Sequence, residues 1–168
     1  MVFKNLRELD WWEEIEFNDT LKVTFVPAQH FSARGLFDRQ QSLWGGYMIE
    51  SRGRRVYFAG DTGYSTHFSD IRNRLGSPDI AMLGIGAYEP RWFMKPIHMN
   101  PAEAVCAHRD LGSRQSIGMH FGTFQLTAEK IDQPRKDLTR ALSEASISET
   151  EFVTLDEGET RICRADLP

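Results

Sequence analysis

Three side chains that bind metals in proteins each follow a predicted strand. Asp61 lies between nearby glycines, directly after the apolar run 55–59, and His30 follows the run 23–26. His120 follows a shorter run that ends at Met119. Imidazole nitrogen and carboxylate oxygen are ligands for zinc and similar ions. Because loops at one edge of a sheet lie together, we expect these three side chains to meet at one site.

Each of the three residues also has a simpler interpretation. A chain with five histidines offers such triples by chance, and a histidine that caps an element or packs in the core is commoner than a metal ligand. Asp61, beside glycines, also suits an Asx turn. Spacing alone therefore leaves both the metal site and the purely structural roles open.

The elements that must position these residues follow from the hydrophobic pattern. Alternation in 13–17 and 21–25, around a polar turn, predicts a β-hairpin. A second hairpin is predicted from 43–50 and 55–59, and the paired glycines in its first strand indicate a bulge or a close backbone approach. Trp11 and Trp12 precede both hairpins and are expected to cover the edge of the core; the alternative is that they face a pocket or lipid.

The rest of the chain reads as β-α units. Asn100, Pro101 and Glu103 form an N-terminal capping pattern for one of the helices. Helices are predicted over 65–75, 101–111 and 134–143, strands over 78–83, 114–118, 152–155 and 160–163, and a cleft-lining loop over 84–98. We therefore expect one domain, 1–168, of class α/β (α+β): a mixed sheet with helices on one face.

Composition excludes several classes of function. The net charge is −4, so there is no basic field that would favour nucleic acid. The two cysteines form no C-x-x-C pair, so they indicate neither a thiolate zinc site nor a disulfide scaffold. No apolar run reaches the length of about 18 residues that a membrane span needs. We expect a cytoplasmic protein, with contact to membranes only at their surface. Cys106 is expected in the core, and His67 and His108 in solvated positions on helices.

Several long motifs stand out together and in order. They are Leu9–Trp12, Pro27–His30, Phe58–Tyr64, Ile85–Met94 and His120–Phe124. This set resembles the N-acyl-phosphatidylethanolamine-hydrolysing phospholipase D group of the metallo-β-lactamase superfamily, over essentially the whole chain.

The resemblance implies an αββα sandwich with two metal ions, usually zinc. By position, Asp61 would bridge the ions, His30 would bind one of them and His120 the other. His98 resembles a family histidine near the scissile phosphate, where it would bind a phosphoryl oxygen or assist proton transfer. Tyr88, Trp92, Phe93 and Met94 would line an acyl-chain cleft, and ordinary loop packing is the alternative for these four.

One motif of the family does not occur in this sequence. The superfamily's H-x-H-x-D-H run, which supplies most of the metal ligands, is absent. The chain is therefore expected to correspond to the C-terminal half of the domain and to half of an αββα sandwich. Alone, it should bind zinc weakly or partially and hydrolyse little. We expect it to associate with the missing N-terminal half or to form a homodimer.

Three functions are compatible with these observations. The first is phospholipase D-like hydrolysis of the phosphodiester of N-acyl-phosphatidylethanolamine-type lipids once the domain is complete, catalysed by Asp61 and His98. The second is a lactonase or another hydrolase of small substrates from the same superfamily. The third is a catalytically silent fragment that acts only by association.

Overall fold

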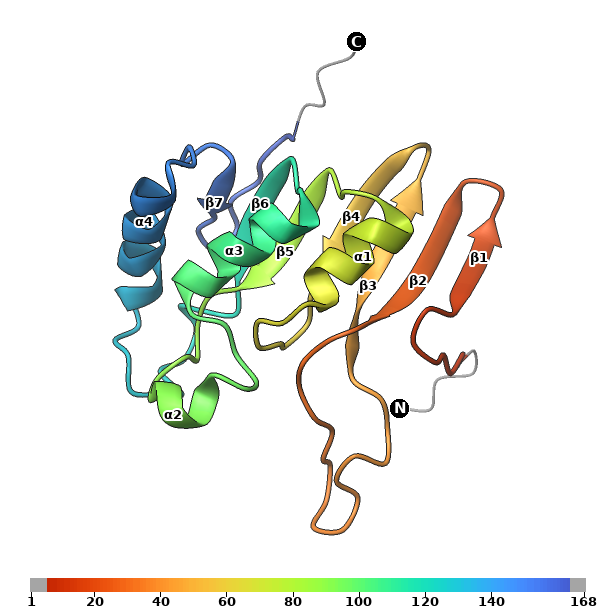
Figure 1. Cartoon of the computed structure of the whole chain (residues 1–168), viewed down its shortest axis with the longest axis horizontal. Helices are drawn as coiled ribbons and strands as arrows, with labels where there is room; N and C mark the ends of the chain where they lie inside the picture. Colours follow the sequence, from red (N-terminus) through yellow and green to blue (C-terminus); the bar gives the residue numbers. More distant parts are fainter. Residues whose placement is uncertain (1–5, 164–168) are drawn as a thin grey trace.

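The computed structural model describes residues 6–163, which form one seven-stranded sheet whose strand order follows the chain order (Figure 1). The strands are β1 (Glu14–Asn18), β2 (Leu21–Pro27), β3 (Gly45–Ser51), β4 (Arg54–Phe58), β5 (Ile80–Gly84), β6 (Gln115–Met119) and β7 (Phe152–Thr154). Strands β1 to β4 pair antiparallel, and β4 to β7 pair parallel. The prediction of a mixed sheet built from two hairpins and β-α units is confirmed.

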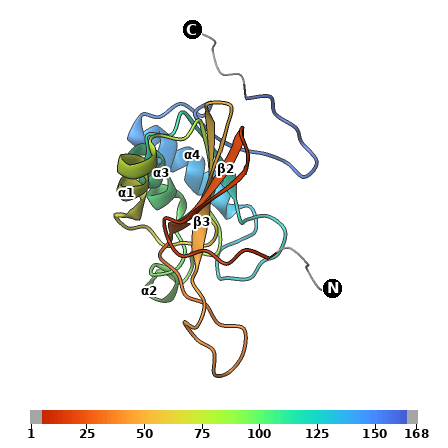
Figure 2. The same cartoon turned by 90° about the vertical axis from the view of Figure 1, so that its right-hand side faces the viewer.

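Three helices cover one face of this sheet: α1 (His67–Leu75), α3 (Pro101–Leu111) and α4 (Gln133–Ala145) (Figure 2). The fourth, α2 (Arg91–Met94), lies beyond the end of β5 rather than on that face. Between the three helices and the sheet, alternate strand residues such as Met48, Tyr57 and Leu83 pack against Phe68 and Leu111. Burial of this apolar surface is the main stabilising term of the fold.

The other face of the sheet is not covered by any helix of the described residues. It carries cross-strand rows of apolar side chains that remain half-buried or exposed. We call this surface the open face; its members include Val23, Ile49, Val56, Phe58, Ile80, Met82 and Ile117. An apolar sheet face of this kind is usual where a second layer packs against it.

The remaining local predictions had mixed outcomes. Trp11 and Trp12 are both partly buried, and Trp12 packs against the core as expected. The close backbone approach predicted for the paired glycines is present, since a Cβ on Gly46 would lie 2.5 Å from Phe58 O. In the described part of the chain, no helix is long and apolar enough to cross a membrane.

Other predictions were wrong. Residues 160–163 form no strand, because no neighbouring strand pairs with them, and Ile162 is exposed. His67 and His108 are buried rather than solvated, and Cys106 is exposed rather than buried. The segment predicted as a loop over 84–98 contains the short helix α2.

Candidate metal centre

Four of the predicted site residues converge at one edge of the sheet because of strand direction. Strand β2 is antiparallel to β3, and β3 is antiparallel to β4, so β2 points the same way as β4, β5 and β6. The carboxyl ends of these four strands therefore meet at the same edge. His30 follows β2, Asp61 follows β4, His98 lies in the connection after β5, and His120 directly follows β6.

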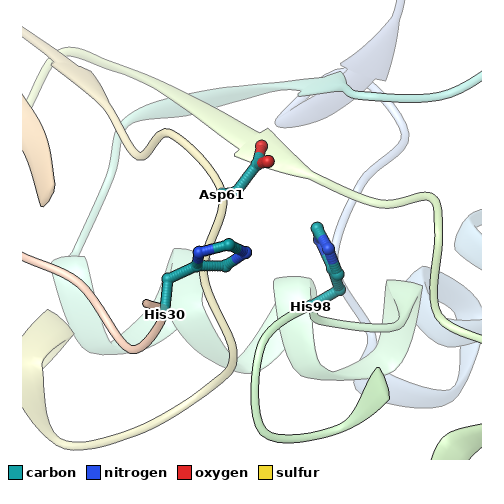
Figure 3. Close-up of side chains that lie close together, drawn as sticks. All are labelled: His30, Asp61 and His98. Atoms are coloured by element: carbon teal, nitrogen blue, oxygen red, sulfur yellow. The ribbon is translucent and has the colours of Figure 1, made fainter. Parts of the chain in front are cut away.

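The side chains themselves lie within a few ångströms of one another. Ligand atoms of His30, Asp61 and His98 are all within 4.8 Å of each other, and the two imidazoles point into the space beside the carboxylate (Figure 3). His120 Nε2 lies 3.5 Å from Asp61 Oδ1. The ring of His98 is 5.3 Å from that of His30 and 5.1 Å from that of His120. His98 thus stands between the other two histidines.

The protonation of these histidines suits metal binding. The Nδ1 of His30 is 2.8 Å from the main-chain oxygen of Phe31, which can only accept, so Nδ1 is the donor of this hydrogen bond and Nε2 is the ring nitrogen that remains for a metal. Burial, with a smaller repulsive contribution from His120, lowers the pKa of His98 to about 4. His98 is therefore neutral at physiological pH.

The donor set fits a transition metal of the zinc type. Zinc takes neutral imidazole nitrogens and carboxylate oxygens, and three imidazoles with one carboxylate are gathered here. Asp61 is exposed and has two oxygens, so it can reach toward His30 and toward His120.

Hydrogen bonds join the three loops that carry His30, Asp61 and His98. The buried Thr62 is the centre of this set: its Oγ1 accepts the main-chain N–H of Gln29 at 2.9 Å, and its main-chain oxygen accepts the N–H of Met99 at 3.1 Å. Gln29 in turn accepts the N–H of Gly63 at 2.8 Å and donates from Nε2 to Pro96 O at 2.9 Å. Gln29 and Thr62 were not among the predicted site residues; their positions next to His30 and Asp61 are the only sequence signal for their roles.

His98 is positioned by a second set of contacts, made through Arg91. This guanidinium donates from Nη1 to His98 O at 3.0 Å and from Nη2 to Glu103 Oε2 at 2.6 Å. Glu103 also accepts the N–H of Asn100, whose side chain accepts from Glu103, so the predicted capping box of α3 is present. The start of α3 therefore fixes the loop that carries His98.

His120 is held by backbone contacts instead. It has a positive φ of 61°, and the main-chain N–H of Ile85 donates to Met119 O at 3.0 Å. A Cβ on Gly86 would lie 2.2 Å from His120 O. Only glycine at position 86 lets the β5 and β6 ends approach this closely.

The residues predicted to contact substrate divide into two groups. Tyr88 and Met94 are buried, and the Tyr88 hydroxyl donates to Asp137 Oδ2 at 2.5 Å. Trp92 and Phe93 are largely exposed on α2. A separate pocket of about 370 Å³ adjoins His120, and its apolar lining comes mainly from Phe121, Phe124, Leu126 and Ile131.

Comparison with known proteins connects this geometry to a family. A family model described as "Beta-lactamase superfamily domain" matches residues 2–121. The chain is 44% identical over 158 residues to "N-acyl-phosphatidylethanolamine-hydrolyzing phospholipase D 1" of Caenorhabditis elegans, which covers 90% of this chain and 44% of that protein. It is 38% identical over 140 residues to the mitochondrial protein of the same description from Saccharomyces cerevisiae, covering 80% of this chain and 30% of that protein.

Solved structures share the fold. An isothiocyanate hydrolase from Delia radicum gut bacteria superposes with a TM-score of 0.73 at 22% identity, covering 95% of this chain and 60% of that one. Igni18, a metallo hydrolase from Ignicoccus hospitalis, superposes with a TM-score of 0.66 at 24% identity, covering 90% and 57%.

The alignments cover most of this chain but only part of each relative. The chain spans less than half the length of the two phospholipase D relatives named above, while those alignments cover most of this chain. The sequence match and the fold agree: this chain belongs to the metallo-β-lactamase superfamily and is related to its N-acyl-phosphatidylethanolamine-hydrolysing phospholipases D.

Proposed function

We propose that this chain carries one part of a two-metal centre that hydrolyses the phosphodiester bond of phospholipids of the N-acyl-phosphatidylethanolamine type. The observation that supports this most directly is the convergence of His30, Asp61, His98 and His120 at one sheet edge. The substrate class follows from the names of the relatives that are 44% and 38% identical.

Each of the four residues has a role in this proposal. His30 and Asp61 would hold one zinc ion, and Asp61 and His120 the second. Zinc at these positions would stabilise the negative charge that develops on the phosphate oxygens. His98, neutral and placed between the other two histidines, would donate a hydrogen bond to a phosphoryl oxygen or carry a proton to the leaving group.

The centre needs further ligands, which we propose come from a partner layer on the open face. Three metal ligands, His30, Asp61 and His120, are few for two ions, since a catalytic zinc ion commonly takes three protein ligands. The partner would be the N-terminal half of the family domain or a second copy of this chain. By itself, the chain would bind zinc weakly and turn over little substrate.

Metal analysis of the purified chain tests this proposal. We expect H30A, H120A and D61N each to lower zinc affinity by about tenfold or more, because each replaces a side chain that would bind the metal directly. The matched control is D19N, which alters an exposed carboxylate in the turn between β1 and β2, at the amino end of β2. Equal zinc binding by the ligand variants and the control would overturn the assignment.

An activity assay then separates the possible substrates. The chain should be tested alone and in the presence of a segment that supplies H-x-H-x-D-H, with phosphodiesters and lactones as parallel substrates. Phosphodiester hydrolysis only with the added segment is expected. Preference for lactones would identify a small-substrate hydrolase. Inactivity under every condition would support the third function, a catalytically silent fragment that acts only by association. Tight stoichiometric zinc with good turnover by the chain alone would contradict the need for a partner.

A further inference from the structure

Two pairs of large apolar side chains project into solvent from two segments that adjoin the candidate metal centre. Leu36 and Phe37 are 91% and 92% exposed in the connection between β2 and β3, and Trp92 and Phe93 are 83% and 58% exposed on α2. In both views this connection and α2 extend beyond the same end of the sheet (Figures 1 and 2). His30 lies at the start of one of these segments and His98 just after the other. The candidate metal centre therefore adjoins both segments.

Both segments have internal contacts that fix which side chains they expose. In the first, Asp38 Oδ1 accepts the main-chain N–H groups of Arg34 and Gly35 at 3.0 and 2.7 Å, and Ser32 Oγ donates to Ser42 O at 2.6 Å. These bonds close the loop and leave Leu36 and Phe37 at its tip.

In the second segment, Met94 is buried and anchors α2, while Arg91 is held by Glu103. Trp92 and Phe93 contact each other, with ring centroids 5.6 Å apart. Ordered segments therefore hold these apolar side chains in solvent. Each side chain lacks the stabilisation that burial would give it.

The charges beside these side chains indicate the kind of surface that covers them. Arg34 and Arg39 flank the first pair, and Lys95 follows the second; all three are exposed. The nearby carboxylate of Asp38 accepts hydrogen bonds from the main-chain N–H groups of Arg34 and Gly35. Exposed apolar tips next to basic residues, in a chain of net charge −4, suit an anionic phospholipid surface.

A second copy of this chain is a poorer partner for the same patch. In a twofold contact the patch meets itself, so Arg34, Arg39 and Lys95 would face like charges. The two pairs also stand on separate projecting segments (Figure 1), and two separate tips enter a soft lipid layer more readily than they form a packed protein interface.

We propose that Leu36-Phe37 and Trp92-Phe93 form a two-point anchor that inserts into an anionic phospholipid bilayer, with Arg34, Arg39 and Lys95 on the headgroups. In its choice of a lipid partner, this inference rests on the proposed function. Insertion at both tips brings the edge that carries His30, Asp61, His98 and His120 against the headgroup layer, where the phosphodiesters lie. Interfacial segments of this kind enter about 5–10 Å into the headgroup region.

Vesicle co-sedimentation in the presence of EDTA tests the anchor without involving metal or catalysis. The chain is mixed with vesicles of phosphatidylcholine alone and with vesicles of equal parts phosphatidylcholine and phosphatidylglycerol. We expect stronger binding to the second kind. The double variants L36S/F37S and W92S/F93S should each lower the partition coefficient about tenfold or more, and R34Q/R39Q should remove the preference for phosphatidylglycerol.

Matched controls come from the opposite edge of the sheet. Ile162 is 79% exposed, and Arg52 is exposed in the turn between β3 and β4; I162S and R52Q should bind vesicles like the unchanged chain. Quenching by brominated lipid, compared between the chain and W92F, should place Trp92 within the bilayer.

The outcomes separate the two proposals. No binding to either vesicle, or equal loss in the controls and the tip variants, would overturn the anchor and leave the metal centre untouched. Binding that depends on the tips, together with no zinc binding by the metal assay above, would support the anchor and overturn the hydrolytic function.

Discussion

Thr62 makes the most consequential set of contacts at the level of single residues. It is buried next to the exposed Asp61, and it bonds to Gln29 on one side and Met99 on the other. Its hydroxyl also donates to Gly63 O at 2.8 Å. These bonds hold the His30, Asp61 and His98 loops in one arrangement before any ligand binds, so Thr62 acts as a positioning residue.

Replacing Thr62 by valine keeps its shape and removes the hydroxyl. We expect T62V to lower zinc affinity about tenfold to a hundredfold, as loss of outer-shell partners does, while T62S, which keeps the hydroxyl, restores most of it. Isothermal titration with zinc measures both, and cobalt absorption spectra report the ligand geometry. Similar loss in T62V and T62S would show that packing rather than the hydroxyl matters.

His67 is the second residue with a measurable consequence. It lies behind the Asp61 loop, with Nδ1 2.6 Å from Ser65 Oγ and Nε2 3.4 Å from Thr62 Oγ1. Burial lowers its pKa to about 4. The sequence predicts a solvated position for His67, because the first turn of a helix carries no local sign that a loop packs over it.

The lowered pKa of His67 predicts a pH dependence of stability. Below pH about 6.5 the unfolded chain binds a proton at His67 that the folded chain does not accept until about pH 4. The free energy of unfolding therefore falls as pH drops through this window, by about 3 kcal/mol at most from this group, and the loss levels off below pH 4.

The variant H67Q isolates this contribution, since a glutamine side chain can form hydrogen bonds but does not titrate. Urea unfolding of both chains at pH 7 and pH 4.5 should show a smaller pH-dependent loss for H67Q. His98 and His108 also have pKa values lowered by burial, so some acid sensitivity will remain. Identical pH dependence in the two chains would exclude His67 as a source.

At the level of elements, the sheet edge depends on close approach between the ends of β5 and β6. Gly86 is the clearest case because a Cβ there would overlap His120 O. We expect G86A to displace the His120 backbone, to cost about 1–3 kcal/mol of stability, and to weaken the binding of a second zinc ion more than the first.

The control for this substitution is G35A. Its new Cβ would have its nearest neighbours at 3.7 Å, an ordinary contact. Thermal unfolding should separate the two variants, and zinc stoichiometry should change in G86A alone. If G86A matches G35A in both measurements, the approach of the β5 and β6 ends does not constrain His120.

The sequence predicted most elements because their signals are local. Alternation predicted β1 and β2, and two runs on either side of a polar turn predicted β3 and β4. The N-terminal pattern at Asn100 predicted the start of α3. The short helix α2 has too few residues to show a helical period. Residues 160–163 include the β-branched Thr160 and Ile162, which favour a strand, although no strand pairs with this segment. Contacts such as Gln29 to Thr62 join positions far apart in sequence, so no local pattern could indicate them.

On the scale of the whole molecule, the open face has the largest consequence. Residues from strands β2 to β6 form a continuous apolar surface there, whereas the opposite face is closed by α1, α3 and α4. Apolar surface of this kind favours association.

We expect the chain to associate through this surface at micromolar concentrations, and M82E to weaken the association by placing a charge in its centre. Met82 pairs in register with Phe58 and Ile117. Sedimentation equilibrium over a concentration series measures the effect, with L36S as a control that alters a distant exposed apolar side chain. A monodisperse monomer at every concentration would argue against a covered open face.

The strand order also has a consequence for how the protein acquires its structure. Every strand of the sheet pairs with its neighbours in the chain, from β1 through β7. The hairpins β1–β2 and β3–β4 pair residues that are close in sequence and form quickly, and they also leave the ribosome first. Each parallel pair from β4 to β7 forms only after its longer crossover connection has been made. The site is then completed in the order of synthesis, with His30 first, Asp61 and His98 next, and His120 last.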